Sequence, residues 1–99
     1  MNINQLIIEL ETVKHPKINC SVVKLGIVTD IRLKDMKVDI TFAFPYANTP
    51  IADKVIKSIE YKIRSLGFGF SHKTRKMNEV ERARFIQLEI DSWKEKNNL

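Results

Sequence analysis

Apolar residues recur at helical spacing near the start of the chain. These residues are Leu6, Ile7, Leu10 and Val13. This period places them on one face of a helix, whose first free amide groups Asn2 or Asn4 can cap. We expect the helix to end near Lys14, because Pro16 biases His15 away from helical dihedral angles. The opening segment therefore predicts a short amphipathic helix.

The pattern then changes to strict alternation over two segments, residues 27–33 and 38–44. Alternation of apolar and polar residues is typical of strands that bury one face. A polar segment, Lys34–Lys37, separates the two runs. The pattern therefore predicts a β-hairpin with a four-residue turn, covered by other elements on one side only.

A second helical pattern follows the loop at residues 45–50. Its apolar positions are Ile51, Val55, Ile56, Ile59, Ile63 and Leu66. Pro50 suits the first turn of a helix, where its missing N–H costs nothing. Thr49 then takes the N-cap position, and the carboxylate of Asp53 lies favourably in the first turn. Gly67 is the expected stop, because glycine readily adopts the left-handed conformation that ends helices.

Residues 68–75 alternate again and predict a third strand. After them, Asn78 and Glu81 have the spacing of a capping box that opens a last helix reaching about Lys94. The element order is therefore α-β-β-α-β-α. The simplest way to bury every apolar face is an α+β two-layer sandwich, in which helices pack on a small three-stranded mixed sheet. Residues 1–99 are expected to form a single domain.

The last helix carries more apolar residues than one stripe accommodates. At about 100° per residue, Phe85 and Leu88 fall away from the main apolar side. One interpretation is an unusually wide buried face. The other is an exposed apolar pair that contacts a partner or a second copy of the chain.

Composition adds a charge imbalance to this picture. The 99 residues carry a formal net charge of +5, and the basic residues concentrate between residues 54 and 84. Such residues either solvate the outer faces of a helix and a strand or form a docking surface, for which Lys73, Arg75 and Lys76 are the candidates. No apolar run approaches the ~20 residues that cross a bilayer, so we expect no membrane contact. Without a signal-like start, the expected location is the cytoplasm.

Candidate chemistry is sparse. Cys20 is the only thiol, which excludes an internal disulfide, and it is expected to be a small buried apolar residue. One Cys and two separated His residues match no metal-ligand spacing, and no nucleophile elbow or phosphate-binding glycine loop occurs. The remaining candidate is the start of the second helix, where Asn48, Thr49 and Asp53 either bind a polar group or simply cap the helix. His15 could approach this rim.

Three segments resemble a known family. The first runs from Thr12, through His15-Pro16-Lys17 and Leu25-Gly26, to Ile31. The second is the loop from Asn48 through Pro50 to Asp53, and the third is the segment from Met77 to Phe85. Together they are similar to the iron-sulfur cluster assembly domain, whose members include PaaD-like and SufT-like proteins and the domain that precedes Mrp-type P-loop carrier ATPases. The resemblance spans roughly residues 6–94 and implies the same α+β fold and element order.

The differences from the family bear directly on function. The family places a reactive cysteine where this chain has Thr49, and Asp-Pro-Glu where it has His15-Pro16-Lys17. A threonine hydroxyl is not a thiolate ligand for iron. The resemblance therefore implies a non-enzymatic accessory or scaffold module that binds no metal or cofactor by itself. It would act through a functional loop, formed by residues 48–50, Asp53 and His15, on a P-loop cluster carrier, a target apoprotein or a second copy of itself.

Two other functions remain open at this point. A small basic nucleic-acid-binding domain could use Lys73, Arg75 and Lys76, although the chain lacks the fuller aromatic pattern of an RNA-binding sheet and a Gly-x-x-Gly clamp. A small hydrolase or isomerase could use His15 and Asp53 as an acid-base pair, which requires the two groups to meet at one substrate atom.

Overall fold

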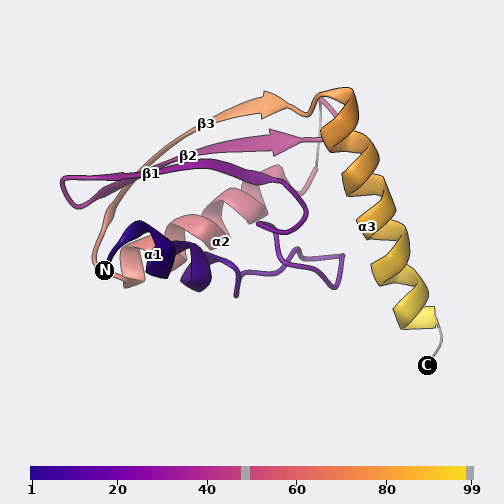
Figure 1. Ribbon diagram of the computed structural model, residues 1–99, viewed down its shortest axis with the longest axis horizontal. Coiled ribbons are helices and arrows are strands. Elements are labelled where there is room, and N and C mark those ends of the chain that lie inside the picture. The colour runs from indigo at the N-terminus through magenta and orange to yellow at the C-terminus, as the bar shows by residue number, and fades with distance from the viewer. Residues whose placement is uncertain (48–49, 98–99) are drawn as a thin grey trace.

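Three helices and one three-stranded sheet make up the computed structural model, which describes residues 1–47 and 50–97, the last five of these by their backbone alone (Figure 1). The elements are α1 (Ile3–Leu10), β1 (Val28–Lys34), β2 (Lys37–Phe44), α2 (Ala52–Ser65), β3 (Gly69–Lys76) and α3 (Glu79–Asn97). This confirms the predicted α+β class and the order α-β-β-α-β-α. None of the helices described is long and apolar enough to span a membrane.

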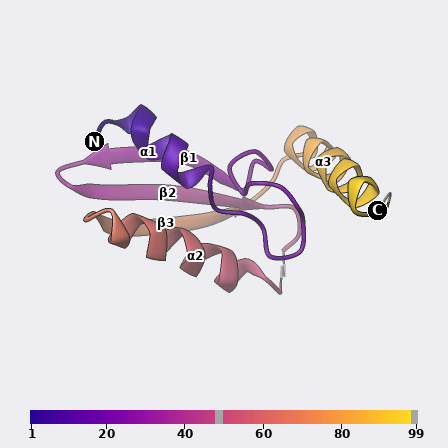
Figure 2. The same ribbon diagram turned by 90° about the horizontal axis from the view of Figure 1, so that it is seen from below.

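The sheet has the order β1-β2-β3, so β2 is its central strand. β1 pairs with β2 in antiparallel fashion, and β3 pairs with β2 in parallel. Helices α1 and α2 both lie against one face, whereas the other face carries no helix, and α3 lies beyond one end of the sheet (Figures 1 and 2). The predicted mixed sheet covered on one side is therefore confirmed.

The core fills the space between the sheet and the two helices. Its fully buried side chains include Leu6, Leu10, Val38, Ile40, Phe42, Val55, Ile59 and Ile63. The opposite face of β2 is also buried at two positions, Thr41 and Ala43. Both side chains are small, and their neighbours across β3 are the longer Lys73 and Arg75. The long side chains of Lys73 and Arg75 shield their shorter neighbours, so Thr41 and Ala43 are buried without a covering helix.

The hairpin turn is shorter than predicted. Lys34 pairs directly with Lys37, which leaves a two-residue turn at Asp35 and Met36. Both turn residues have positive φ, 51° and 63°. This conformation characterises a type I′ turn, whose backbone twist matches that of the paired strands. The tight turn was missed because methionine is an unusual occupant of the left-handed region.

Helix α1 also ends earlier than predicted, at Leu10 rather than near Lys14. Beyond Leu10 the chain leaves the helix through turns, in which the N–H groups of Thr12 and Val13 donate to the carbonyls of Glu9 and Leu10 at 3.2 and 3.1 Å. Lys14 then forms an antiparallel bridge with Ser21, and such pairing needs an extended rather than a helical backbone. The N-cap is Asn2, as one of the two candidates predicted, and it forms a capping box with Gln5.

The other helices differ from prediction at single ends. Helix α2 begins at Ala52 with Ile51 at the N-cap position, whereas the predicted cap, Thr49, lies outside the described residues. Gly67, with φ of +91°, confirms the predicted stop, and its N–H donates to the carbonyl of Arg64 at 3.0 Å. Helix α3 begins at the predicted capping box but runs to Asn97, past the expected end.

We predict that Met36→Gly stabilises the protein. Glycine adopts positive φ without the strain of a Cβ, and the side chain that is lost is 65% exposed, so little burial is given up. The gain should be about 0.5–1 kcal/mol in the free energy of unfolding, measured by urea denaturation. Met36→Ala is the matched control, because it removes the same side chain and keeps the Cβ. Equal stability of the two variants would contradict the prediction.

Candidate functional site

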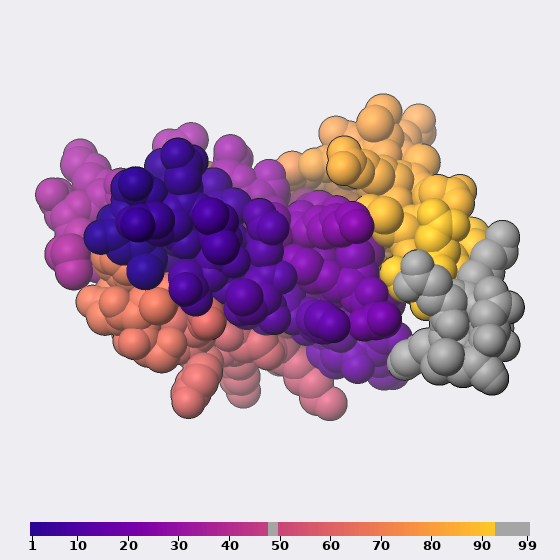
Figure 3. Space-filling model, turned by 60° about the horizontal axis from the view of Figure 1, so that its bottom comes forward, coloured from indigo at the N-terminus to yellow at the C-terminus, as the bar shows by residue number. Residues whose placement is uncertain are grey.

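A groove of about 460 Å³ lies where three separate segments meet. One wall is α3, and the others are the loop at residues 15–19 and the segment that follows β2. It is lined by His15, Lys17, Ile18, Asn19, Pro45, Tyr46, Pro50, Ile51, Phe85, Glu89, Ile90 and Ser92. Figure 3 shows the yellow side chains of α3 lying against the violet segment that follows α1. The volume falls within the range of small-molecule and short-peptide sites.

The first loop is held by its own backbone. The N–H of His15 donates to the carbonyl of Cys20 at 3.0 Å, beside the bridge between Lys14 and Ser21. These contacts close residues 15–20 into a tight loop that places Ile18 at the groove. Cys20 is a free thiol buried in the core, as expected for a small apolar residue.

The second loop follows directly from the end of β2. Pro45 cannot donate to a sheet, so the strand ends before it. Pro45 is buried and Tyr46 exposed, and both line the groove. After the two residues outside the described part of the chain, Pro50 and Ile51 line it again, immediately before α2. The groove therefore lies beside the carboxyl end of the central strand.

His15 is a buried imidazole in this groove, with 8% of its surface exposed. Its Nδ1 accepts a hydrogen bond from the backbone N–H of Lys17 at 3.0 Å. Burial first, and the Lys17 ammonium second, lower the pKa of His15 below its usual 6.5. The ring is therefore neutral at pH 7. Because Nδ1 acts as acceptor, the proton resides on Nε2, which leaves an N–H donor for an occupant of the groove.

Helix α3 is anchored through its buried face. Phe85 is 4% exposed and belongs to the core, and Met77, just before the helix, is 6% exposed. Leu88 is half-buried against the same core. This corrects the exposed apolar pair that was one interpretation of the sequence. The wide buried face is not observed either, because Ala83 and Ile90, on the main apolar side, are exposed. The exposed apolar residue of α3 that lines the groove is Ile90, at 42% exposure.

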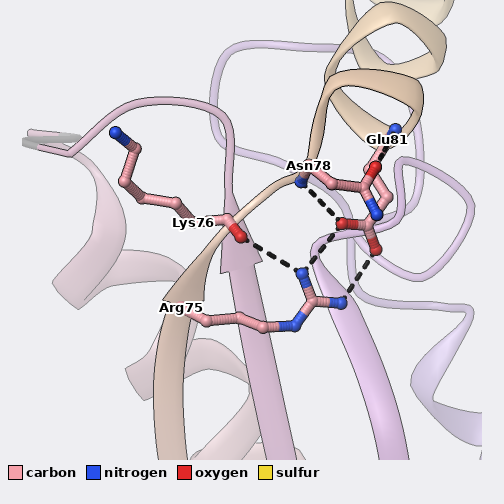
Figure 4. Close-up of polar contacts among 4 residues, drawn as sticks. All are labelled: Arg75, Lys76, Asn78 and Glu81. Carbon is pink, nitrogen blue, oxygen red and sulfur yellow. Dashed lines mark hydrogen bonds and ion pairs between the residues drawn. The ribbon is translucent and has the colours of Figure 1, made fainter.

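A polar cluster fixes the start of α3 to the end of β3 (Figure 4). Both terminal nitrogens of Arg75 donate to the two carboxylate oxygens of Glu81 at 2.8 Å, and Nη1 also reaches the carbonyl of Lys76 at 3.1 Å. The N–H of Asn78 donates to Glu81 Oε1 at 2.9 Å, and Asn78 Oδ1 accepts from the N–H of Glu81 at 2.8 Å. The predicted capping box is thus confirmed and extended by Arg75.

Electrostatics follow from this geometry. The hydrogen bonds from Arg75, and then the one from the Asn78 N–H, lower the pKa of Glu81 to about 2. The same carboxylate raises the pKa of Arg75. The guanidinium is therefore engaged within the chain. Of the other two basic candidates, Lys73 lies on the helix-free face beside Thr41, and Lys76 is on the opposite face in register with Phe44. None of the three lines the groove.

The structure brings together only part of the predicted functional loop. His15 and Pro50 both line the groove, whereas Asp53 is exposed in the first turn of α2 and does not. Asn48 and Thr49 lie outside the described residues. The hydrogen bond found for His15 is to the Lys17 backbone, and no hydrogen bond among the described residues joins His15 to Asp53. This geometry does not support the acid-base pair.

Several groove residues were missed by sequence analysis. Ile18, Tyr46 and Ile90 all contribute walls. Their only signal in the sequence was that each is apolar within a polar or irregular setting, a pattern shared with many surface residues. In the described part of the chain, no group of three or more His, Cys, Asp or Glu side chains is arranged to hold a metal ion.

We predict that stability falls as pH drops below about 6.5. The unfolded chain takes up a proton at His15 in this range, whereas burial opposes protonation in the folded protein, so acid favours unfolding until the lowered folded-state pKa is passed. Urea denaturation between pH 7.5 and 5 should show the loss. It should be smaller in His15→Asn, whose Oδ1 can still accept the Lys17 N–H. His72→Asn, which removes the other imidazole, is the control and should retain the loss.

We also predict that Arg75→Gln raises the pKa of Glu81 from about 2 toward its usual 4.5. The rise should be incomplete, because the N–H of Asn78 still donates to the carboxylate. Since the folded pKa is depressed, the ion pair stabilises the protein above pH 4.5 and loses its effect as pH falls through 2. An NMR titration of the Glu81 carboxyl carbon measures this. Lys73→Gln removes the same charge nearby, and an equal shift there would contradict the specific contact.

Comparisons with known proteins bear on this arrangement. A family described as iron-sulfur cluster assembly protein matches residues 5–71, more than half of the chain. Among solved structures, the chain is similar to a domain of unknown function, DUF59, from Bacillus anthracis, with a TM-score of 0.70 and 20% identity. That match covers 88% of this chain and 91% of the other. A search of the curated proteins returned no significant match.

Proposed function

The chain belongs to the iron-sulfur cluster assembly protein family, and we propose that it serves there as a non-enzymatic docking module for a partner protein. The groove is the observation that carries this proposal. Its walls come from α3 and two loops, and most of its lining is apolar. Apolar concave surfaces with a few polar groups are typical binding sites, because their burial by a partner releases water from apolar area.

Side-chain chemistry favours docking over carrying a cluster. Iron-sulfur clusters are held chiefly by cysteine thiolates, and the single thiol of this chain, Cys20, is buried in the core. Thr49 occupies the loop position at which the resemblance places the reactive cysteine. A partner that carries or receives the cluster, such as a P-loop carrier ATPase or a target apoprotein, would supply those ligands itself.

In the part of the chain that the structure describes, the helix-free sheet face lacks the feature by which RNA-binding sheets hold their ligand. RNA-binding sheets stack bases on exposed aromatic side chains. Here Phe70 is in register with Val38, on the helix-covered side, and its ring packs edge-on against Phe42 with centroids 6.4 Å apart. Among the described residues of the strands, the helix-free face offers no aromatic ring for stacking.

The test compares two lysine substitutions on α3. Ile90 lines the groove, whereas Val80 is exposed on the same helix and does not line it. We expect the purified protein to bind the P-loop cluster carrier or an apoprotein client of its own organism in isothermal titration calorimetry. Ile90→Lys should weaken binding at least tenfold, because it places a charge in an apolar contact. Val80→Lys should change it by less than about twofold.

Three results would contradict the proposal. The first is the absence of binding to both classes of partner, and the second is equal binding by the two variants. The third is self-association: if sedimentation shows a stable dimer that Ile90→Lys separates, the groove is covered by a second copy of the chain instead.

A further inference from the structure

Several polar residues line the groove, and His15 is the one that is buried; Asn19 and Tyr46 are exposed and Ser92 is half-buried. His15 is about nine-tenths buried, and its Nδ1 is occupied by the Lys17 N–H. The Nε2–H is then the polar group that the ring can still offer, and His15 lines the groove. A buried N–H without an acceptor costs about 1–3 kcal/mol once water is excluded. An occupant that fills the groove must therefore supply an acceptor or bear that cost.

The charges of the lining indicate which kind of acceptor fits. One cation, Lys17, and one anion, Glu89, line the groove, so their charges cancel. The imidazole adds no charge at neutral pH, as its burial requires. A carboxylate would lose its hydration here without a net positive field to replace it. A backbone carbonyl is a strong acceptor with no charge, and it enters an apolar site at much lower cost.

We propose that His15 is the specificity contact of the groove, donating from Nε2 to a backbone carbonyl of an uncharged apolar peptide segment of the partner. This inference rests on the proposed docking function and identifies the chemistry of what docks. The flanking apolar side chains of the segment would contact Ile18, Ile51 and Ile90. The buried donor then rejects occupants that are apolar but lack an acceptor, because binding them leaves the N–H unpaired.

The test uses the full chain and a capped neutral peptide, acetyl-Ser-Leu-Ile-Ser-amide, titrated by NMR. We expect saturable shifts at groove residues and at the His15 ring. A second peptide, in which an alkene replaces the central Leu-Ile amide, keeps the shape and removes the carbonyl together with the amide N–H. It should bind the wild type at least fivefold more weakly, the factor expected when a buried donor loses its acceptor.

His15→Asn completes the comparison. The asparagine keeps an acceptor for the Lys17 N–H but removes the Nε2–H donor of His15. The amide peptide should therefore bind this variant at least fivefold more weakly than it binds the wild type. The variant should no longer distinguish the amide from the alkene peptide, which is the coupling expected of a direct contact. Because the alkene peptide also tests the wild type, the inference does not depend on the folding of the variant.

The remaining outcomes distinguish a failure of the inference about His15 from a failure of the docking function. No peptide binding, alongside a partner that still binds and responds to Ile90→Lys, excludes a simple apolar peptide while docking stands. Equal binding of the amide and alkene peptides excludes His15 as the donor. Tenfold tighter binding of acetyl-Asp-Leu-Ile-Asp-amide would show an anion site instead. If Ile90→Lys did not weaken binding of the partner protein, that result would contradict the docking function itself.

Discussion

The structure depends on hydrogen bonding by the central strand β2 along both of its edges. Beyond its pairing with β1 and β3, the strand holds the segments that follow or precede them: the N–H of Ala43 donates to the carbonyl of Ile27 at 2.8 Å, and the carbonyl of Phe44 accepts from Met77 at 2.8 Å. One end of β2 thus positions the approach to β1 and the start of α3. Pro45 ends β2 beside these two segments. All three walls of the groove are therefore positioned by the same end of β2.

Helix α3 is held by two interactions of different size. Burial of a phenylalanine side chain such as Phe85 stabilises by about 1.5–3 kcal/mol, whereas a surface ion pair contributes about 0–1 kcal/mol. The Arg75 side chain in the pair with Glu81 is 40% exposed. Burial of Phe85 therefore keeps α3 attached, and the cluster at its first turn sets the direction in which it leaves β3. That direction determines whether Ile90 faces the groove.

The groove combines apolar walls with a buried neutral imidazole, and the chemistry open to that imidazole is limited. A general acid or base needs a pKa near the working pH and access to a substrate proton. Burial lowers the pKa of His15, and its Nδ1 is engaged by the backbone. What the fold forms at this end of β2 is a groove, which we propose as a docking surface for another protein.

Periodicity alone determined the element order and the class, because burial of one face imposes a repeat of 3.6 or 2 residues that local sequence shows directly. The family resemblance came instead from particular residues, such as Leu25-Gly26 and the loop from Pro50 to Asp53. The capping box at Asn78 and the stop at Gly67 were likewise local. Tertiary contacts decided the rest: Lys14 pairs with Ser21 where the periodicity predicted the last residue of a helix, and Phe85 is buried although it falls away from the main apolar side. The groove depends on segments about 30 residues apart or more, and no local pattern records which loops the central strand brings together.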